Sequence, residues 1–192
     1  MPQQPEDPSP HPVTLVRMPI QGRGTAWAVE HRFNAQQRVS LDDGWGMLDE
    51  LASEERANPA TTLIEENARS ILASNDSPDI GFDLSINPYR GCEHGCIYCY
   101  ARPTHSYLNL SPGIDFETRI VAKMNAAELL RKAFASKAYV PRALNLGSVT
   151  DAYQPVERRL GITRAVIEVL AQHQHAFSVI TKSSLIERDL DV

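Results

Sequence analysis

The sequence lacks the features that mark a membrane-spanning or secreted protein. None of its 192 residues belong to an apolar run that approaches the ~20 residues needed to cross a bilayer. The first segment, MPQQPEDPSPHP, is polar and proline-rich and contains no apolar core of a secretory signal. There are only three cysteines, which cannot all pair within one chain, and this argues against a disulfide framework. We therefore expect a cytoplasmic protein with reduced thiols and no membrane partner.

The composition is that of a globular chain with an uneven distribution of charge. With 42% hydrophobic and 22% charged residues, the chain is long enough for one sizeable core and a small second unit. Residues 1–80 carry a net charge of −7, whereas residues 81–192 carry a net charge of +2. The charge of the second part permits a polyanionic partner but does not require one.

Local composition divides the chain into three parts. Residues 1–12 contain five prolines and almost nothing apolar, which predicts a disordered tail. Residues 13–80 are predicted to be a mixed N-terminal extension, with a short strand at VTLVRMPI, a turn at GRGT and an amphipathic helix over residues 60–73. Proline cannot continue a helix, so the Asn-Asp-Ser-Pro run that follows is expected to end it.

The third part, residues 81–192, alternates between strand and helix patterns. The predicted elements are, in order, a strand at FDLSINPY, a helix from about Ala126 with an Asn125–Glu128 capping box, a buried strand at ALNLGSV, a helix from Ile162, a strand at AFSVITK and a further element from LIERDLDV. Strands that alternate with helices indicate parallel pairing in an α/β fold. Three such units leave a sheet edge unpaired, and a (βα) barrel needs six to eight of them. We therefore expect an N-terminal fragment of a longer protein, with a partial (βα) barrel truncated after about three units and an N-terminal extension.

All three cysteines lie in one short loop, RGCEHGCIYCYARP, directly after the first of these strands. Cys92, Cys96 and Cys99 have the spacing of one helical face, but a helix would spread their thiols over roughly 10 Å. Gly91 and Gly95 break a helix and let the backbone curl, so that the three sulfurs can converge. In α/β folds the end of a strand is also where sites are placed.

Four interpretations of this loop are open. The cysteines are buried structural residues, or the last two form a redox pair of the C-x-x-C type. Alternatively, the three cysteines and His94 bind a structural zinc ion. The fourth interpretation is a [4Fe-4S] cluster held by three thiolates with one iron left open. We favour the cluster because it accounts for three cysteines without a fourth.

The spacing C-x3-C-x2-C, with an aromatic residue just before the last cysteine, resembles the signature of the radical S-adenosylmethionine (radical SAM) superfamily. The resemblance implies that Cys92, Cys96 and Cys99 hold a [4Fe-4S] cluster whose open iron binds S-adenosyl-L-methionine (SAM). In that superfamily an electron from the cluster cleaves SAM, and the resulting 5′-deoxyadenosyl radical abstracts hydrogen from the substrate. Tyr98 matches the aromatic residue that packs near the adenine.

Longer strings, SINPYRGCEHGCIYCYARPTHSYL, LGSVTDAYQPVER and VITKSSL, resemble the uncharacterised bacterial branch related to spore photoproduct lyase. This resemblance implies a partial barrel of the radical SAM type. It also implies that Ser148, Thr150, Asp151 and Lys182 help to hold SAM. The alternatives are that Asp151 caps a turn and that Lys182 is a solvated lysine at a strand end.

One departure from the lyase pattern limits the resemblance. The lyase has a hydrogen-donating cysteine after the second strand, for which the nearest match here is Ser148, and an O–H bond is a much poorer hydrogen-atom donor than S–H. Tyr98 and Tyr100 do match the lyase pattern and are candidates for a radical relay. Direct repair of a spore photoproduct is therefore not the expected reaction, and the substrate stays unassigned.

The expected function is that of a radical SAM enzyme that takes electrons from a flavodoxin- or ferredoxin-like donor. Nucleic acid is the substrate class suggested by the lyase resemblance alone. The rival interpretation is a zinc- or cluster-stabilised binding module without turnover. Three arginines, Arg90, Arg102 and Arg119, surround the cysteines in sequence. They would raise the potential of a cluster or bind a phosphate, or, as the simpler interpretation, form a solvated face.

Overall fold

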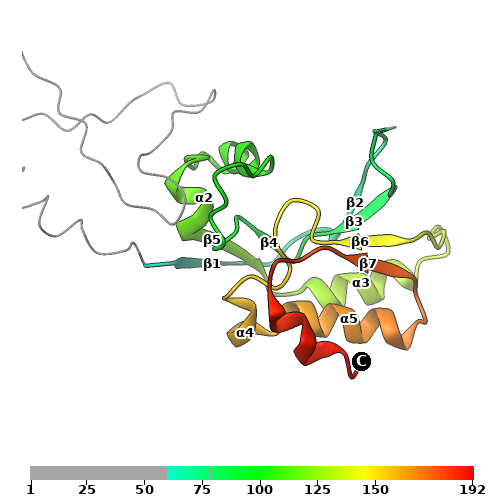
Figure 1. Ribbon diagram of the computed structural model, residues 1–192. Helices are drawn as coiled ribbons and strands as arrows, with labels where there is room; N and C mark the ends of the chain where they lie inside the picture. The colour runs from blue at the N-terminus through cyan, green and yellow to red at the C-terminus, as the bar shows by residue number, and fades with distance from the viewer. Residues whose placement is uncertain (1–59, 78) are drawn as a thin grey trace, which may run out of the picture.

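The computed structural model describes residues 60–77 and 79–192, which form a mixed α/β unit with two small sheets (Figure 1). The predicted tail, and the strand and turn predicted before residue 60, lie outside the described residues. In chain order the elements are β1 (Thr62–Glu66), β2 (Leu72–Ser74), β3 (Leu84–Ile86), β4 (Tyr89–Arg90), the 3-10 helix η1 (Arg102–Leu108), α2 (Ile114–Thr118), β5 (Arg119–Lys123), α3 (Ala126–Phe134), β6 (Leu144–Leu146), α4 (Glu157–Leu160), α5 (Ile162–Gln172), β7 (Phe177–Val179) and the 3-10 helix η2 (Ser184–Asp189).

The larger sheet has the strand order β2-β3-β6-β7. β3, β6 and β7 are parallel, and β2 pairs with β3 in the antiparallel direction. The predicted strands at FDLSINPY, ALNLGSV and AFSVITK are therefore confirmed, and so is their parallel pairing. The described residues do not close a barrel, and the partial barrel stays a prediction.

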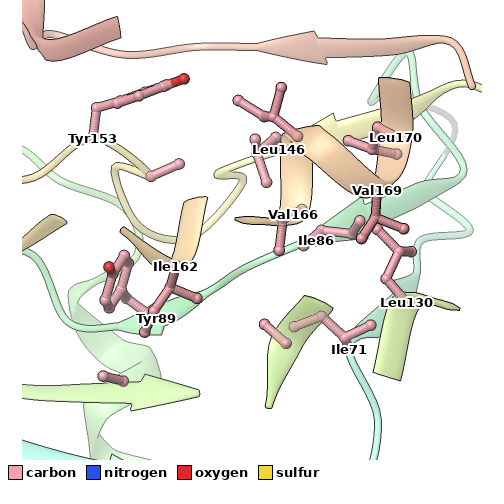
Figure 2. Close-up of a cluster of buried hydrophobic side chains, with 14 of the residues drawn as sticks. Ile71, Ile86, Tyr89, Leu130, Leu146, Tyr153, Ile162, Val166, Val169 and Leu170 are labelled. Atoms are coloured by element: carbon pink, nitrogen blue, oxygen red, sulfur yellow. The ribbon is translucent and has the colours of Figure 1, made fainter. Parts of the chain in front are cut away.

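α3 and α5 lie side by side on one face of this sheet (Figure 1). Each helix turns an apolar face toward the strands, because its apolar residues recur with the helical period. Figure 2 shows Ile86 and Leu146 of the sheet close to Leu130 of α3 and to Val166 and Val169 of α5. Together with neighbouring buried side chains, these residues make the main hydrophobic core.

The opposite face of the same sheet carries a polar row. Ser85, Asn145 and Ser178 occupy one register position across β3, β6 and β7. Ser178 Oγ donates a hydrogen bond to Asn145 Oδ1 over 3.0 Å. Parallel strands are usually apolar on both faces. Here, in contrast, the polar row occupies one face, so the core residues of these strands are confined to alternate positions.

The smaller sheet has the order β1-β5-β4. β1 runs parallel to β5 over five residue pairs, and β4 is antiparallel to β5. The chain thus passes from β3 in the larger sheet to β4 in the smaller one within four residues. The predicted strand at FDLSINPY is divided between the two sheets at this point.

The helix predicted over residues 60–73 is wrong, since this segment forms β1 and β2. Thr62 and Ile64 are β-branched and favour a strand, and pairing with β5 satisfies the backbone of the segment. Ala68 and Ile71, which fitted the helical period, are buried between the two strands instead. Strands on either side of the predicted boundary at residue 80 therefore pair with each other, since β1 pairs with β5 and β2 pairs with β3.

α3 begins at Ala126 as predicted, but the predicted capping box is wrong. The side-chain amide of Asn125 bonds to the backbone of Ala68, accepting from its N–H over 2.9 Å and donating to its carbonyl over 3.0 Å. Glu128 pairs instead with Lys132 at 2.6 Å. Asn125 therefore joins two distant segments rather than capping its own helix.

The last predicted element is η2, which is held against the start of α5 by buried carboxylates. Glu157 Oε2 accepts hydrogen bonds from Tyr89 Oη over 2.5 Å and from the backbone N–H of Thr163 over 2.9 Å. Its other oxygen accepts from Arg188 of η2 over 2.9 Å. Glu157 is fully buried, so this carboxylate links β4, α5 and η2 through charge-assisted bonds.

Across residues 60–77 and 79–192, the helices are too short or too polar to cross a lipid bilayer.

Candidate functional site

The cysteine loop begins directly after β4 and consists of successive turns. Gly91 and Gly95 have positive φ angles of 80° and 61°, where L side chains are strained. The N–H of Gly95 donates to the carbonyl of Cys92 over 3.1 Å, and that of Cys99 donates to Cys96 over 3.2 Å. The expectation that the glycines prevent a continuous helix is therefore confirmed.

The three thiols are free, and they differ in exposure. Cys92 is buried, whereas Cys96 and Cys99 are partly exposed. Burial raises the pKa of the Cys92 thiol to about 11, against the opposing effect of the backbone N–H groups of Asp151 and His94. In the described part of the chain, no three His, Cys, Asp or Glu side chains are placed to hold one metal ion.

Lys182 brings a positive charge to the loop from the segment after β7. Its Nζ lies 3.1 Å from Cys96 Sγ and donates a hydrogen bond to Tyr98 Oη. It also lies 4.6 Å from the centre of the Tyr98 ring. Hydrogen bonds to Tyr98 and Cys96 raise the pKa of Lys182 above its usual value. The fold therefore brings the ammonium group of Lys182 next to the thiol of Cys96, which lies 86 residues earlier in the sequence.

Asp151 fixes the segment that carries Lys182. One carboxylate oxygen accepts from Thr181 Oγ1 over 2.6 Å and from the N–H of Tyr153 over 2.8 Å, and the other accepts from the N–H of Lys182 over 2.8 Å. His94 Nε2 of the cysteine loop lies 3.3 Å from the same carboxylate. Burial alone would raise the pKa of Asp151, but the hydrogen bonds, beginning with that of His94, hold it below its usual value.

Thr150 and Gln154 hold the first residue of the loop. Thr150 Oγ1 donates to the carbonyl of Gly91 over 2.6 Å, and Gln154 Nε2 donates to the same carbonyl over 3.3 Å. Gln154 Oε1 accepts from the N–H of Glu93 over 2.9 Å. Both side chains are buried. Thr150, one of the predicted SAM-binding residues, thus uses its hydroxyl to fix the loop.

Ser148 and Tyr100 meet at the end of β6. Tyr100 Oη donates to the backbone carbonyl of Ser148. The Ser148 hydroxyl lies 2.9 Å from the Asn87 side-chain Nδ2, and Asn87 Oδ1 accepts from the N–H of Val149 over 2.9 Å. Tyr98 and Tyr100 are 76% and 75% exposed as residues, so both remain accessible to a ligand.

Every predicted site residue therefore lies at the edge of the sheet where the parallel strands end, in contact with the cysteine loop or with a residue that holds it. Asn87, Glu93 and Gln154 also hold the site, and no motif in the sequence predicts them. Their roles depend on contacts across about 60 residues, and no local spacing indicates them.

The expectation of a solvated arginine face holds only in part. Arg90 lies 3.5 Å from Glu66 and Arg119 lies 3.4 Å from Asp115, with both guanidinium groups substantially exposed. Arg102, in contrast, is only 7% exposed. Its side chain points into the protein and contacts the cysteine loop from inside.

Comparison with known proteins gives relatives without assigned functions. The chain is 42% identical over 109 residues to Uncharacterized protein Rv2578c of Mycobacterium tuberculosis, a match that covers 57% of this chain and 32% of that protein. Uncharacterized protein Mb2609c of Mycobacterium bovis matches to the same extent. Uncharacterized protein MJ0683 of Methanocaldococcus jannaschii is 33% identical over 135 residues, which cover 70% of this chain and 48% of that protein.

The chain thus spans between about a third and a half of the length of the curated relatives that it matches. No family model and no solved structure matches it.

Proposed function

We propose that this chain carries the cluster- and SAM-binding part of a radical SAM enzyme. The observation that carries the proposal is the position of Lys182. A cation from the end of β7 lies beside the second of three free thiols and beside an exposed aromatic ring. A chelated amino acid carboxylate next to a cluster would need such a cation, because charge-assisted hydrogen bonds are the strong ones.

The donor set fits a [4Fe-4S] cluster. Cys92, Cys96 and Cys99 would each bind a different iron, so their sulfurs do not have to meet around one ion. Among the described residues no side chains are grouped around a single metal ion. This observation disfavours a zinc site and does not affect the cluster, whose ligands bind separate irons. When bound, the cluster supplies the electron for reductive cleavage of SAM.

The residues around the loop would divide into binding and positioning roles. Lys182 would donate to the carboxylate of SAM, and the exposed Tyr98 ring would pack against the adenine. Thr150 and Asp151 would act as positioning residues, because protein donors and acceptors already engage their polar atoms. Ser148 and Tyr100 would border the same space, and a relay through Tyr100 rests on its exposure and its place beside Cys99.

The remaining parts of the proposal rest on the resemblance. They are the flavodoxin- or ferredoxin-like electron donor, nucleic acid as a substrate class and the abstraction of a hydrogen atom from the substrate. The chain's net charge of +2 over residues 81–192 is compatible with an anionic partner but does not select one.

The test is anaerobic reconstitution of the full chain with iron and sulfide. We expect about four irons per chain and, after reduction with dithionite, an EPR signal that changes when SAM is added. Cys96→Ser should abolish the signal, and Lys182→Met should keep the iron but require about tenfold more SAM for the same response. Lys123→Met, at a lysine of β5 in the smaller sheet, is the matched control. A colourless protein that holds about one zinc per chain would instead support the binding module.

A further inference from the structure

Arg102 is buried against the cysteine loop, and all five N–H donors of its guanidinium group have an acceptor. Nε donates to the carbonyl of Cys96 over 2.9 Å, and Nη2 donates to the carbonyl of Gly95 over 2.7 Å and to Glu117 Oε2 over 3.1 Å. Nη1 donates to the carbonyls of Gly113 and Pro112 over 2.9 Å and 3.3 Å. A guanidinium has five donors in a fixed plane, so this arrangement uses its full capacity.

The acceptors belong to two separate segments, the cysteine loop and the run from the Pro112–Gly113 turn into α2. Two of them are backbone carbonyls in the middle of the cysteine loop, between Cys92 and Cys99. The others lie in the turn at Pro112–Gly113 and on α2. One side chain therefore fixes the loop between its outer thiols to the body of the protein.

The charge of Arg102 is balanced within the protein. Glu117 is fully buried and lies 3.1 Å away. The Phe116 ring lies 5.3 Å from the guanidinium carbon and provides an additional contact. Because the pair is neutral as a whole, its effect on the loop is mainly geometric rather than a long-range field.

We propose that Arg102 is the positioning residue for the middle of the cysteine loop. It holds the Gly95 and Cys96 carbonyls in the conformation in which the three thiols act as ligands, and it touches neither iron nor SAM. The part of this inference that concerns cluster loading rests on the proposed function, whereas the part that concerns the loop conformation does not. Lysine cannot replace this residue, because its three donors radiate from one point and cannot reach five acceptors in a plane.

The first measurement is hydrogen exchange in the chain without metal. In Arg102→Lys, the amides of Gly95 and Cys99, which close the turns of the loop, should exchange about tenfold faster or more. The amides of α5 should keep their protection. Arg119→Gln is the matched control, because Arg119 is an exposed arginine near the same loop, and it should behave as the unchanged protein.

The second measurement is iron content after anaerobic reconstitution. Arg102→Lys should retain less than half of the iron of the unchanged chain, and its EPR signal should broaden. In Arg102→Gly, millimolar guanidinium chloride should restore both the loop protection and the iron content, whereas sodium chloride at equal ionic strength should not. Rescue by the free cation would show that the missing group is the planar donor set and not the bulk of the side chain.

The outcomes separate this inference from the proposed function. If the unchanged chain takes up no iron, the proposed function fails, and hydrogen exchange still decides the role of Arg102. Loop protection in Arg102→Lys equal to that of the unchanged chain would overturn the inference, whatever the iron content. If the substitution also removes protection from α5, then the absence of guanidinium rescue in Arg102→Gly would overturn it.

Discussion

Replacement of Gly91 by alanine tests whether the start of the cysteine loop is packed as tightly as the structure indicates. Gly91 has a φ of +80°, and an added Cβ would lie 2.8 Å from the carbonyl oxygen of Phe116 and 2.8 Å from His105 Cε1. It would also lie 3.1 Å from Ile120 Cδ1. The Phe116 oxygen accepts the N–H of Cys92 over 2.8 Å, so it cannot move away without breaking that bond.

The expected cost has two parts. The left-handed backbone strains an L residue by about 1–2 kcal/mol, and crowding in a packed region adds about 1–3 kcal/mol. The free energy of unfolding should therefore fall by about 2–5 kcal/mol. With a urea slope of about 2 kcal/mol/M, the unfolding midpoint should fall by about 1–2.5 M.

Two other glycines separate these contributions. Gly161 has a φ of +65° but open space around its Cβ position, so Gly161→Ala should show only the backbone strain of about 1–2 kcal/mol. Gly81 has neither a positive φ nor a neighbour within 4 Å, so Gly81→Ala should be neutral or slightly stabilising. The assay is urea unfolding of the three variants followed by circular dichroism. Equal midpoints for Gly91→Ala and Gly161→Ala would refute the close packing of the loop.

Three further predictions concern single side chains. Tyr89→Phe removes the donor to buried Glu157, so the free energy of unfolding should fall by about 1–3 kcal/mol in urea titrations; an unchanged midpoint would contradict the contact. Burial lowers the pKa of His105, so the unfolded chain, with a value near 6.5, binds a proton that the folded chain does not. Stability from the neutral ring is then fully present above about pH 6.5 and is lost as the pH falls toward the lower folded pKa, and His105→Gln should flatten this dependence in unfolding curves. Lys182→Met should weaken binding of SAM to the reconstituted chain about tenfold in equilibrium dialysis, and undiminished affinity would exclude Lys182 as a ligand residue.

The helical periods and buried apolar runs of residues 81–192 were sufficient to predict most of the larger sheet and its helices. Ile162, Val166 and Leu170 form a continuous apolar face on α5, and that face does pack against the strands. The same reasoning failed for residues 60–73, because the apolar spacing of this short segment also fits two strands. Its structure is decided by pairing with β5, more than 50 residues away, and no local pattern contains that information.

The candidate site likewise contains residues that the sequence predicts and residues that only the tertiary structure reveals. The three cysteines and the two glycines lie within one short stretch of the sequence. The chemistry of the cysteines indicates a metal or cluster site without reference to the fold. Lys182 was identified through a resemblance, and its contact with Cys96 spans 86 residues. Arg102 is close to the cysteines in sequence, but its burial depends on the acceptors of α2 and the Pro112–Gly113 turn. An arginine next to a loop is usually exposed, so only the tertiary structure distinguishes it from Arg90 and Arg119.

The conformation of the loop depends on residues that bear no cluster chemistry themselves. Gln154 and Thr150 hold its first carbonyl, Arg102 holds the carbonyls in its middle, and Asp151 places the lysine that meets its second thiol. These contacts come from the segments after β6 and β7 and from Arg102 at the start of η1, which Glu117 of α2 holds in turn. The spacing C-x3-C-x2-C alone therefore does not determine the positions of the thiols. A peptide of residues 90–103 alone would keep the ligands and Arg102, but it would lose the contacts from the segments after β6 and β7 and the anchors of Arg102 on α2 and its preceding turn. Binding of a cluster by such a peptide would therefore cost the conformational entropy of ordering the loop. In the folded chain the loop is already ordered, so cluster binding carries no such cost.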